Sequence, residues 1–206
     1  MTPTLFQKLL GAPFYSLPDA VRALHEIRGH CVYVGRVDVE RGRNLLARLC
    51  ARLAGLPPAR QGAAISIAFD TLPNCETWRR NFDGHAMQST LVKDGRYLSE
   101  RLGPVRFRLA LRVLDGAIVW HVERARLFNV IPLPMSWFVD VRCREGEDNG
   151  RYTFEVQASM PLVGLLVRYA GWLEHVEVLH GSRHDGQASV ARPVDDAGST
   201  PRHATA

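Results

Sequence analysis

Four Asp-Gly or Asn-Gly dipeptides divide the middle of this 206-residue chain. They are Asp83-Gly84, Asp94-Gly95, Asp115-Gly116 and Asn149-Gly150. A type I′ hairpin turn needs a positive φ at both central residues, and such pairs adopt it readily. Because strand-like runs flank each dipeptide, the pattern predicts a succession of neighbouring antiparallel strands.

Alternation of apolar and polar residues supports this prediction. In the segment 106–113, Phe107, Leu109 and Leu111 alternate with arginines and an alanine. A period of two is typical of a sheet with one buried and one solvated face. The same alternation predicts strands over residues 118–122, 137–143 and 152–158.

Helices are predicted near the start of the chain. Residues 1–30 form an N-terminal helical segment in this interpretation, and a strand follows over residues 31–39. A helix that packs against the sheet is predicted over residues 42–54, because apolar residues recur there at helical spacing. They are Leu45, Leu46, Leu49 and Leu53.

The segment 161–176 fits either a helix or a strand. A helix would favour a helix-grip lipid-binding shape, whereas a strand would favour a barrel-like or cradle-like sheet. We favour the strand, because Gly164 and Gly171 would each weaken a helix by about 1 kcal/mol relative to alanine. Residues 181–206 are nearly free of large apolar groups and are predicted to be a disordered tail.

The predicted fold is therefore α+β and mainly β. A curved antiparallel β-meander, shaped as a half-barrel or cradle, spans residues 31–180 with N-terminal helices and one packing helix. A sheet of this many strands must twist and often curls.

Composition limits the kinds of partner that we expect and the cellular location. The net charge is +5, but the arginines are spread along the chain, so we expect no nucleic-acid partner. The four cysteines are isolated in the sequence, which favours reduced thiols and a cytoplasmic location. No stretch reaches the roughly 18 apolar residues of a transmembrane helix. We expect no cofactor and no metal, since no nucleotide-binding loop is present and His175, His180 and His184 match no ligand spacing.

The most informative stretch is Cys75–Phe82. If it is a strand, Glu76, Trp78, Arg80 and Phe82 point to one side, and the aromatic residues make that side the inner one. A buried acid and a buried cation each need a partner. The stretch therefore predicts either a pocket with an aromatic wall or a purely structural ion pair, formed between Glu76 and Arg80 or across strands.

A second acidic residue is placed inward by the same reasoning. Glu100 shares a strand face with Leu98 and Leu102, so it either joins Glu76 in a two-carboxylate site or is solvated or ion-paired. The inner face also carries aromatic residues able to line an apolar cavity: Trp78, Phe82, Phe107, Trp120 and Phe154. The candidate ligand-binding residues are Glu76, Trp78, Arg80, Phe82, Glu100, Trp120 and Tyr169. No catalytic residue is assigned.

Several segments together resemble an uncharacterised bacterial family, the domain of unknown function 4166. The similarity covers roughly residues 5–175, and its most distinctive element is the Glu-x-Trp-x-Arg-x-Phe pattern of residues 76–82. Other matching segments are Leu5–Gly11, Leu17–Gly29, Gly35-Arg36 with the helix up to Gly55-Leu56-Pro57, Glu100–Pro104 and Tyr169–Leu173. The resemblance implies a domain that often follows a saccharopine-dehydrogenase-like NADP-binding domain, and it implies no established active site.

Three functions remain open from the sequence. The leading hypothesis is a module that binds a small amphipathic or lipid-like ligand. The second is an enzyme that uses Glu76 or Glu100 as a general acid or base. The third, implied by the resemblance, is an accessory or interaction domain for a separate NADP-dependent dehydrogenase-like subunit.

Overall fold

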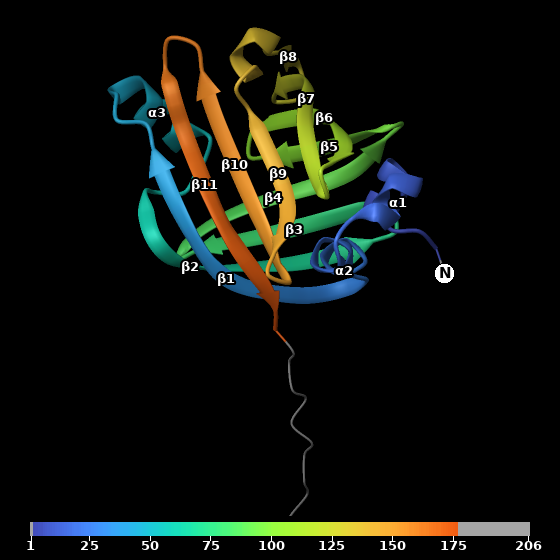
Figure 1. Cartoon of the computed structure of the whole chain (residues 1–206). Helices are drawn as coiled ribbons and strands as arrows, with labels where there is room; N and C mark the ends of the chain where they lie inside the picture. Colours follow the sequence, from blue (N-terminus) through green and yellow to red (C-terminus); the bar gives the residue numbers. More distant parts are fainter. Residues whose placement is uncertain (1, 177–206) are drawn as a thin grey trace, which may run out of the picture. The chain divides into compact units, whose positions relative to one another are not determined.

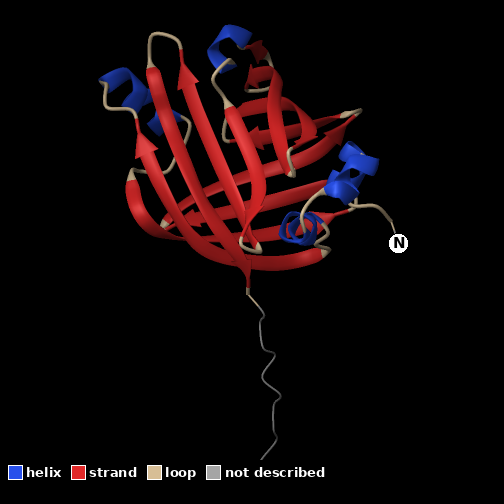
Figure 2. Cartoon of the chain, viewed as in Figure 1, coloured by secondary structure: helices blue, strands red, loops and turns tan. Residues whose placement is uncertain are grey.

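The structure is a computed structural model, and it describes residues 2–176. The predicted tail, residues 181–206, lies outside the described residues. Residues 2–176 are mainly β, with a few short helices (Figures 1 and 2). The helices are α1 (Leu5–Leu10), the 3-10 helix η1 (Ala12–Ser16), α2 (Asp19–His25), α3 (Leu45–Leu53) and the 3-10 helix η2 (Met135–Phe138). The strands are β1 (Gly29–Arg41), β2 (Arg60–Leu72), β3 (Cys75–Phe82), β4 (His85–Asp94), β5 (Tyr97–Leu102), β6 (Val105–Leu114), β7 (Ala117–Leu127), β8 (Ile131–Pro132), β9 (Arg142–Asp148), β10 (Arg151–Met160) and β11 (Gly164–His175).

The sheet closes on itself as a ten-stranded antiparallel barrel. Its strand order is β6-β5-β4-β3-β2-β1-β11-β10-β9-β7, and β7 also pairs with β6. Strand β8 adds a two-residue pairing to the outer part of β7. The half-barrel or cradle shape predicted from the sequence was therefore too open. Closure pairs the two outer strands with each other, whereas a half-barrel would have two free edges to protect.

The four glycine-containing turns are all present. Asp83, Asp115 and Asn149 have φ values of 47°, 49° and 50°, and the glycine after each also has a positive φ. These three are the expected type I′ hairpins. The fourth differs by one position, because Asp94 pairs with Tyr97 and Gly95 is the first turn residue.

The segment 161–176 contains strand β11, so the favoured alternative was correct and the helix was wrong. Gly171 lies opposite Val37 of β1. A Cβ atom at Gly171 would lie 2.1 Å from the carbonyl oxygen of Arg36, and one at Gly35 would lie 1.8 Å from that of Trp172. The two glycines therefore let β1 and β11 approach closely.

The N-terminal helices cover one end of the barrel. Helix α1 begins with a capping box between Thr4 and Gln7. Its Phe6 is fully buried, with its ring centroid 6.1 Å from that of Trp78 and 5.9 Å from that of Trp120. The ammonium of Lys8 donates to the Pro73 carbonyl, at the β2–β3 turn, over 2.6 Å. This end is closed by a packed plug, which we call the plugged end.

Helix α3 lies at the other end of the barrel (Figure 1) and does not pack as the sequence suggested. Its four leucines are 52 % to 80 % exposed, whereas Ala47 and Ala51 are buried. The side chain of Asn44 caps the helix by accepting from the Ala47 amide and donates to the Val163 carbonyl. These contacts seat the helix on its small residues, so its leucine stripe faces outward.

The predicted strand over residues 137–143 was also wrong for most of its length. Strand β9 begins only at Arg142, and Met135–Phe138 is the 3-10 helix η2. Pro132 and Pro134 precede this helix, and proline cannot donate to a strand ladder. Trp137 and Val139 are therefore exposed. Within residues 2–176, no helix is long and apolar enough to span a bilayer.

Candidate functional site

A cavity of about 460 Å³ lies inside the barrel. Leu53 and Trp137 line this cavity and are themselves 71 % and 39 % exposed, so it reaches solvent at the end where α3 and η2 lie. We call this opening the mouth. The volume falls in the range of about 300–1,000 Å³ found for small-molecule sites.

The cavity wall is predominantly apolar. The residues Phe107, Leu109 and Val122 line one part of it, and Phe154, Val156 and Val167 line another. The five aromatic residues expected on the inner face all contribute to the lining: Trp78, Phe82, Phe107, Trp120 and Phe154. The alternation read from the sequence therefore placed the correct face inward.

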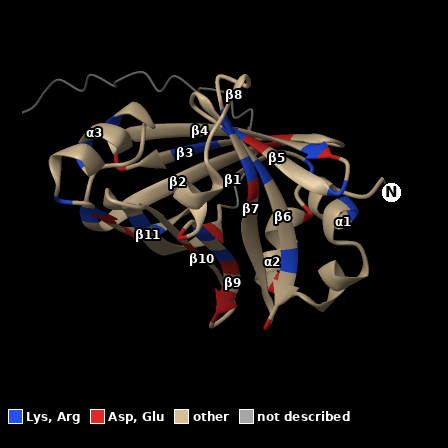
Figure 3. Cartoon of the chain, turned by 90° about the horizontal axis from the view of Figure 1, so that it is seen from above, with Lys and Arg blue, Asp and Glu red and all other residues tan. Residues whose placement is uncertain are grey.

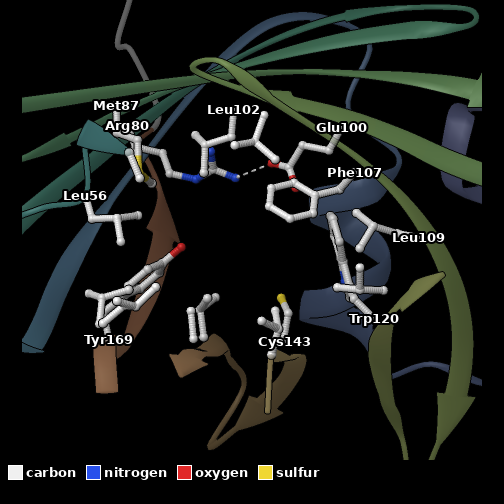
Figure 4. A pocket seen from close by; sticks show the side chains of 18 of the residues that line it. Leu56, Arg80, Met87, Glu100, Leu102, Phe107, Leu109, Trp120, Cys143 and Tyr169 are labelled. Carbon is white, nitrogen blue, oxygen red and sulfur yellow. Dashed lines mark ion pairs between the residues drawn. The ribbon is translucent and has the colours of Figure 1, made fainter. Parts of the chain in front are cut away.

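Arg80 and Glu100 are charged residues of this wall, and they face each other (Figure 4). The Arg80 Nη2 atom lies 3.8 Å from Glu100 Oε1, and the two side chains are 10 % and 15 % exposed. They come from β3 and β5, and Ser89 on the intervening strand β4 accepts from Arg80 Nη1 over 2.9 Å. The guanidinium carbon also lies 5.0 Å from the centre of the Trp78 ring.

This arrangement decides between the alternatives for the acidic residues. The ion pair of Arg80 is with Glu100, across strands, so the proposed Glu76–Arg80 pair was wrong. Glu100 is likewise engaged with a cation rather than with Glu76. A separation of 3.8 Å is longer than a direct charged hydrogen bond, and a guanidinium carries five N–H donors. Arg80 therefore retains donors that an oxygen entering the cavity can reach.

Glu76 lies apart from the cavity lining. It is 4 % exposed, and its Oε2 atom accepts from Trp78 Nε1 over 2.9 Å. Burial raises the pKa of Glu76, and the neighbouring His25 partly opposes this increase. The remaining six candidate residues all line the cavity: Trp78, Arg80, Phe82, Glu100, Trp120 and Tyr169.

A second buried polar cluster, which was not predicted from the sequence, lies toward the plugged end. His25 Nε2 lies 2.8 Å from Glu145 Oε2, and both side chains are almost fully buried. Both had a signal in the sequence: Glu145 continues the inward alternation through Cys143, and His25 follows Val21 by four residues, on one helix face. Burial raises the pKa of Tyr152 well above its ordinary value, and the charge of Glu145 adds to the effect.

Glu145 and Ser159 also line the cavity, as do two neutral aromatic residues with polar groups, Trp120 and Tyr169. Trp120 is 6 % exposed, and its indole N–H has no hydrogen-bond partner among the described residues. The hydroxyl of Tyr169 points into the cavity (Figure 4), and burial raises its pKa, which keeps it a neutral O–H group. Burial also raises the pKa of Cys143 well above its usual value, which disfavours a reactive thiolate.

The donors of this cavity fit a ligand oxygen better than a metal. Within residues 2–176, no group of three or more His, Cys, Asp and Glu side chains is arranged to hold a metal ion. His180 and His184 lie outside the described residues. An arginine, a phenol and two carboxylates, Glu100 and Glu145, inside an apolar wall are the few orienting polar groups typical of a small-molecule pocket.

The fold and the cavity place the protein among closed antiparallel β-barrels with an internal cavity of ligand size. The chain belongs to the family described as Domain of unknown function (DUF4166), whose profile matches residues 17–173. The resemblance seen in the sequence is thus confirmed.

One similar solved structure is the crystal structure of Rv2717c from M. tuberculosis. It is 12 % identical and aligns with a TM-score of 0.41, covering 78 % of this chain and 99 % of that one. No curated protein matches the chain.

Proposed function

We propose that the barrel binds a small amphipathic ligand, with its apolar body in the cavity and an oxygen-bearing head group on Arg80. One observation carries the proposal: a nearly buried guanidinium with a loosely placed acidic partner faces an apolar cavity of about 460 Å³. Each methylene group that the ligand buries contributes about 0.8 kcal/mol.

The head group is the part that the geometry specifies. A buried charge is costly unless its hydrogen bonds are completed. A carboxylate, sulfonate or phosphate oxygen would complete those of Arg80, and the Tyr169 hydroxyl offers a further donor from the same wall. The ligand class is therefore an apolar molecule with a compact anionic or strongly accepting head.

The other hypotheses have less support. Glu76 does not line the cavity and accepts from Trp78, and Glu100 faces Arg80, so neither carboxylate is placed as a free acid or base beside a bound molecule. A role as accessory domain to a dehydrogenase-like subunit, and a cytoplasmic location, stay predictions.

A matched pair of fluorescent probes tests the proposal. The probe 1-anilinonaphthalene-8-sulfonate carries an anionic head, and N-phenyl-1-naphthylamine has the same aromatic body without it. We expect Arg80→Met to weaken binding of the sulfonate probe about 10- to 100-fold, the range for a hydrogen bond to a charged group, and to leave the neutral probe nearly unchanged. The variant Arg80→Met/Glu100→Gln repeats the measurement without an unpaired carboxylate.

Two controls make the result specific. Arg79 lies on the same strand but pairs with Asp70 on the outside, so Arg79→Met should leave both probes unchanged. Ala158 lines the cavity, so Ala158→Phe should lower the affinity for both probes. If Arg80→Met weakens both probes equally, or neither, the head-group assignment is wrong. If Ala158→Phe changes nothing, the probes do not occupy the cavity.

A further inference from the structure

Large apolar side chains are exposed around the mouth. They come from three segments that meet at that end of the barrel: α3, residues 128–139 and the β10–β11 turn at residues 161–163 (Figure 1). We call their exposed apolar residues the mouth rim. They are Leu45, Leu46, Leu49, Leu53, Phe128, Val130, Ile131, Met135, Trp137, Val139 and Leu162.

Most of the exposed large apolar residues of the described chain are concentrated in the mouth rim. Of the 15 large hydrophobic residues exposed in residues 2–176, 11 belong to the mouth rim. The other four are Tyr15, Val34, Leu72 and Leu114. Single exposed apolar side chains are ordinary, whereas a continuous apolar patch on a protein surface indicates an interaction site.

The charged residues within α3 are all basic, and the other two segments of the mouth rim carry no charged residue. Arg43, Arg48 and Arg52 are exposed on or beside α3, whose basic residues are blue in Figure 3. The sequence holds no Asp or Glu in residues 41–69, 124–139 or 156–173, which contain all three segments. Nearby, Asp140 follows the second segment, and Asp83 is neutralised by an ion pair with Arg60.

We propose that the mouth rim docks the barrel onto the surface of a lipid bilayer that contains anionic lipids. Leucines on one face of a helix, with arginines beside them, form the pattern of helices that lie in a membrane interface. Arginine side chains reach toward lipid headgroups while their stems cover apolar surface. Anionic headgroups match the excess of arginine and the lack of carboxylates.

The position of the mouth rim at the cavity opening also favours a bilayer. Strand β11 starts at the mouth and ends at His175, which pairs with Tyr33 near the start of β1, so the described chain ends away from the rim. Leu53 and Trp137 belong both to the rim and to the cavity lining. Docking would place the cavity opening against the apolar layer. The proposal concerns the outer surface and holds whether or not the cavity takes a ligand.

Vesicle sedimentation tests this proposal with the full chain. The vesicles are pure phosphatidylcholine, or phosphatidylcholine with about one quarter phosphatidylglycerol. We expect at least about tenfold tighter binding to the anionic vesicles, and weaker binding as salt increases. Leu45→Ser/Leu49→Ser should lower that affinity at least about tenfold, because two buried leucines would be lost from the bilayer contact. Arg48→Gln/Arg52→Gln should remove the preference for phosphatidylglycerol.

The control variant is Leu72→Ser/Leu114→Ser, which removes two exposed leucines from strand ends outside the rim. It should bind vesicles as the unchanged protein does. Absence of binding to either vesicle, or equal loss in the rim and control variants, would overturn the proposal. Rim-dependent self-association on size-exclusion chromatography without vesicle binding would also overturn it, and would assign the rim to contacts between copies. The probe titrations with Arg80 and Ala158 variants are separate, so failure of ligand binding would be recognised independently.

Discussion

The two ends of one barrel use apolar residues in opposite ways. At the plugged end, Phe6 is fully buried among aromatic rings, and the α1 and α2 segments give their large side chains to the core. At the mouth, α3 buries two alanines and exposes four leucines. Hydrophobicity alone therefore does not tell which helix is part of the core. What decides is whether another part of the protein covers the large apolar side chains of the helix. Within the described chain, those of α1 and α2 are covered and the leucines of α3 are not.

The largest expected effect is at the plugged end. Phe6→Ala should lower the free energy of unfolding by about 3–5 kcal/mol, because a buried aromatic side chain is lost and a cavity is left among Trp78, Trp120 and His25. Urea denaturation followed by circular dichroism measures it. A loss below about 1 kcal/mol would show that the plug is not part of the cooperative core.

The buried His25–Glu145 pair should also stabilise this end. His25→Leu leaves the Glu145 carboxylate without its 2.8 Å partner, which should cost about 1–3 kcal/mol. The double variant His25→Leu/Glu145→Met should recover part of the loss, because no unpaired carboxylate remains. Additive losses in this double-mutant cycle would mean that the two side chains do not interact.

The pH dependence of stability should report on Glu76. Burial raises the pKa of Glu76 in the folded protein, so its neutral form is favoured by folding. This contribution is complete below the pKa of the carboxyl in the unfolded chain and is lost as pH rises through the raised pKa. Glu76→Gln should therefore gain stability relative to the unchanged protein across that window. Parallel stability curves from about pH 4 to 8 would contradict the assignment, and the exposed residue Glu123, as Glu123→Gln, is the control.

The smallest effect is expected at the mouth. Leu46→Ser alters a side chain that is 52 % exposed, so the free energy of unfolding should change by no more than about 0.5 kcal/mol. The same denaturation assay measures it beside Phe6→Ala. A loss above about 2 kcal/mol would show that the leucines of α3 belong to the core, and the contrast between the ends would fail.

Local patterns in the sequence predicted much of the barrel wall. Three hairpins formed at the expected dipeptides, and the inward row Trp78, Arg80 and Phe82 was correct because a strand has a strict period of two. Closure was not predictable in this way. It depends on β7 meeting β9 at only three positions, Ile118 to Trp120, and no local pattern marks so short a pairing between segments separated by a loop.

Where prediction failed, a tertiary contact outweighed a pattern. The leucine stripe of α3 correctly indicated a helix, but it did not show that Ala47 and Ala51 would make the contact. At the candidate site, the partner of Arg80 depended on which strands lie two places apart in the sheet. Strand order brings Glu100 to it, whereas residue spacing had suggested Glu76.

The short pairing of β7 with β9 has a mechanical consequence. Beyond Trp120 that ladder stops, and the next backbone bond on this side of β7 is made by the Leu133 amide to the Ala125 carbonyl. Between these two points β7 and β9 are not paired, and η2 lies against β7, with the Phe138 ring edge-on to the Phe107 ring at a centroid distance of 5.7 Å. The barrel wall between Trp120 and Ala125 therefore depends on side-chain packing rather than on a continuous backbone ladder.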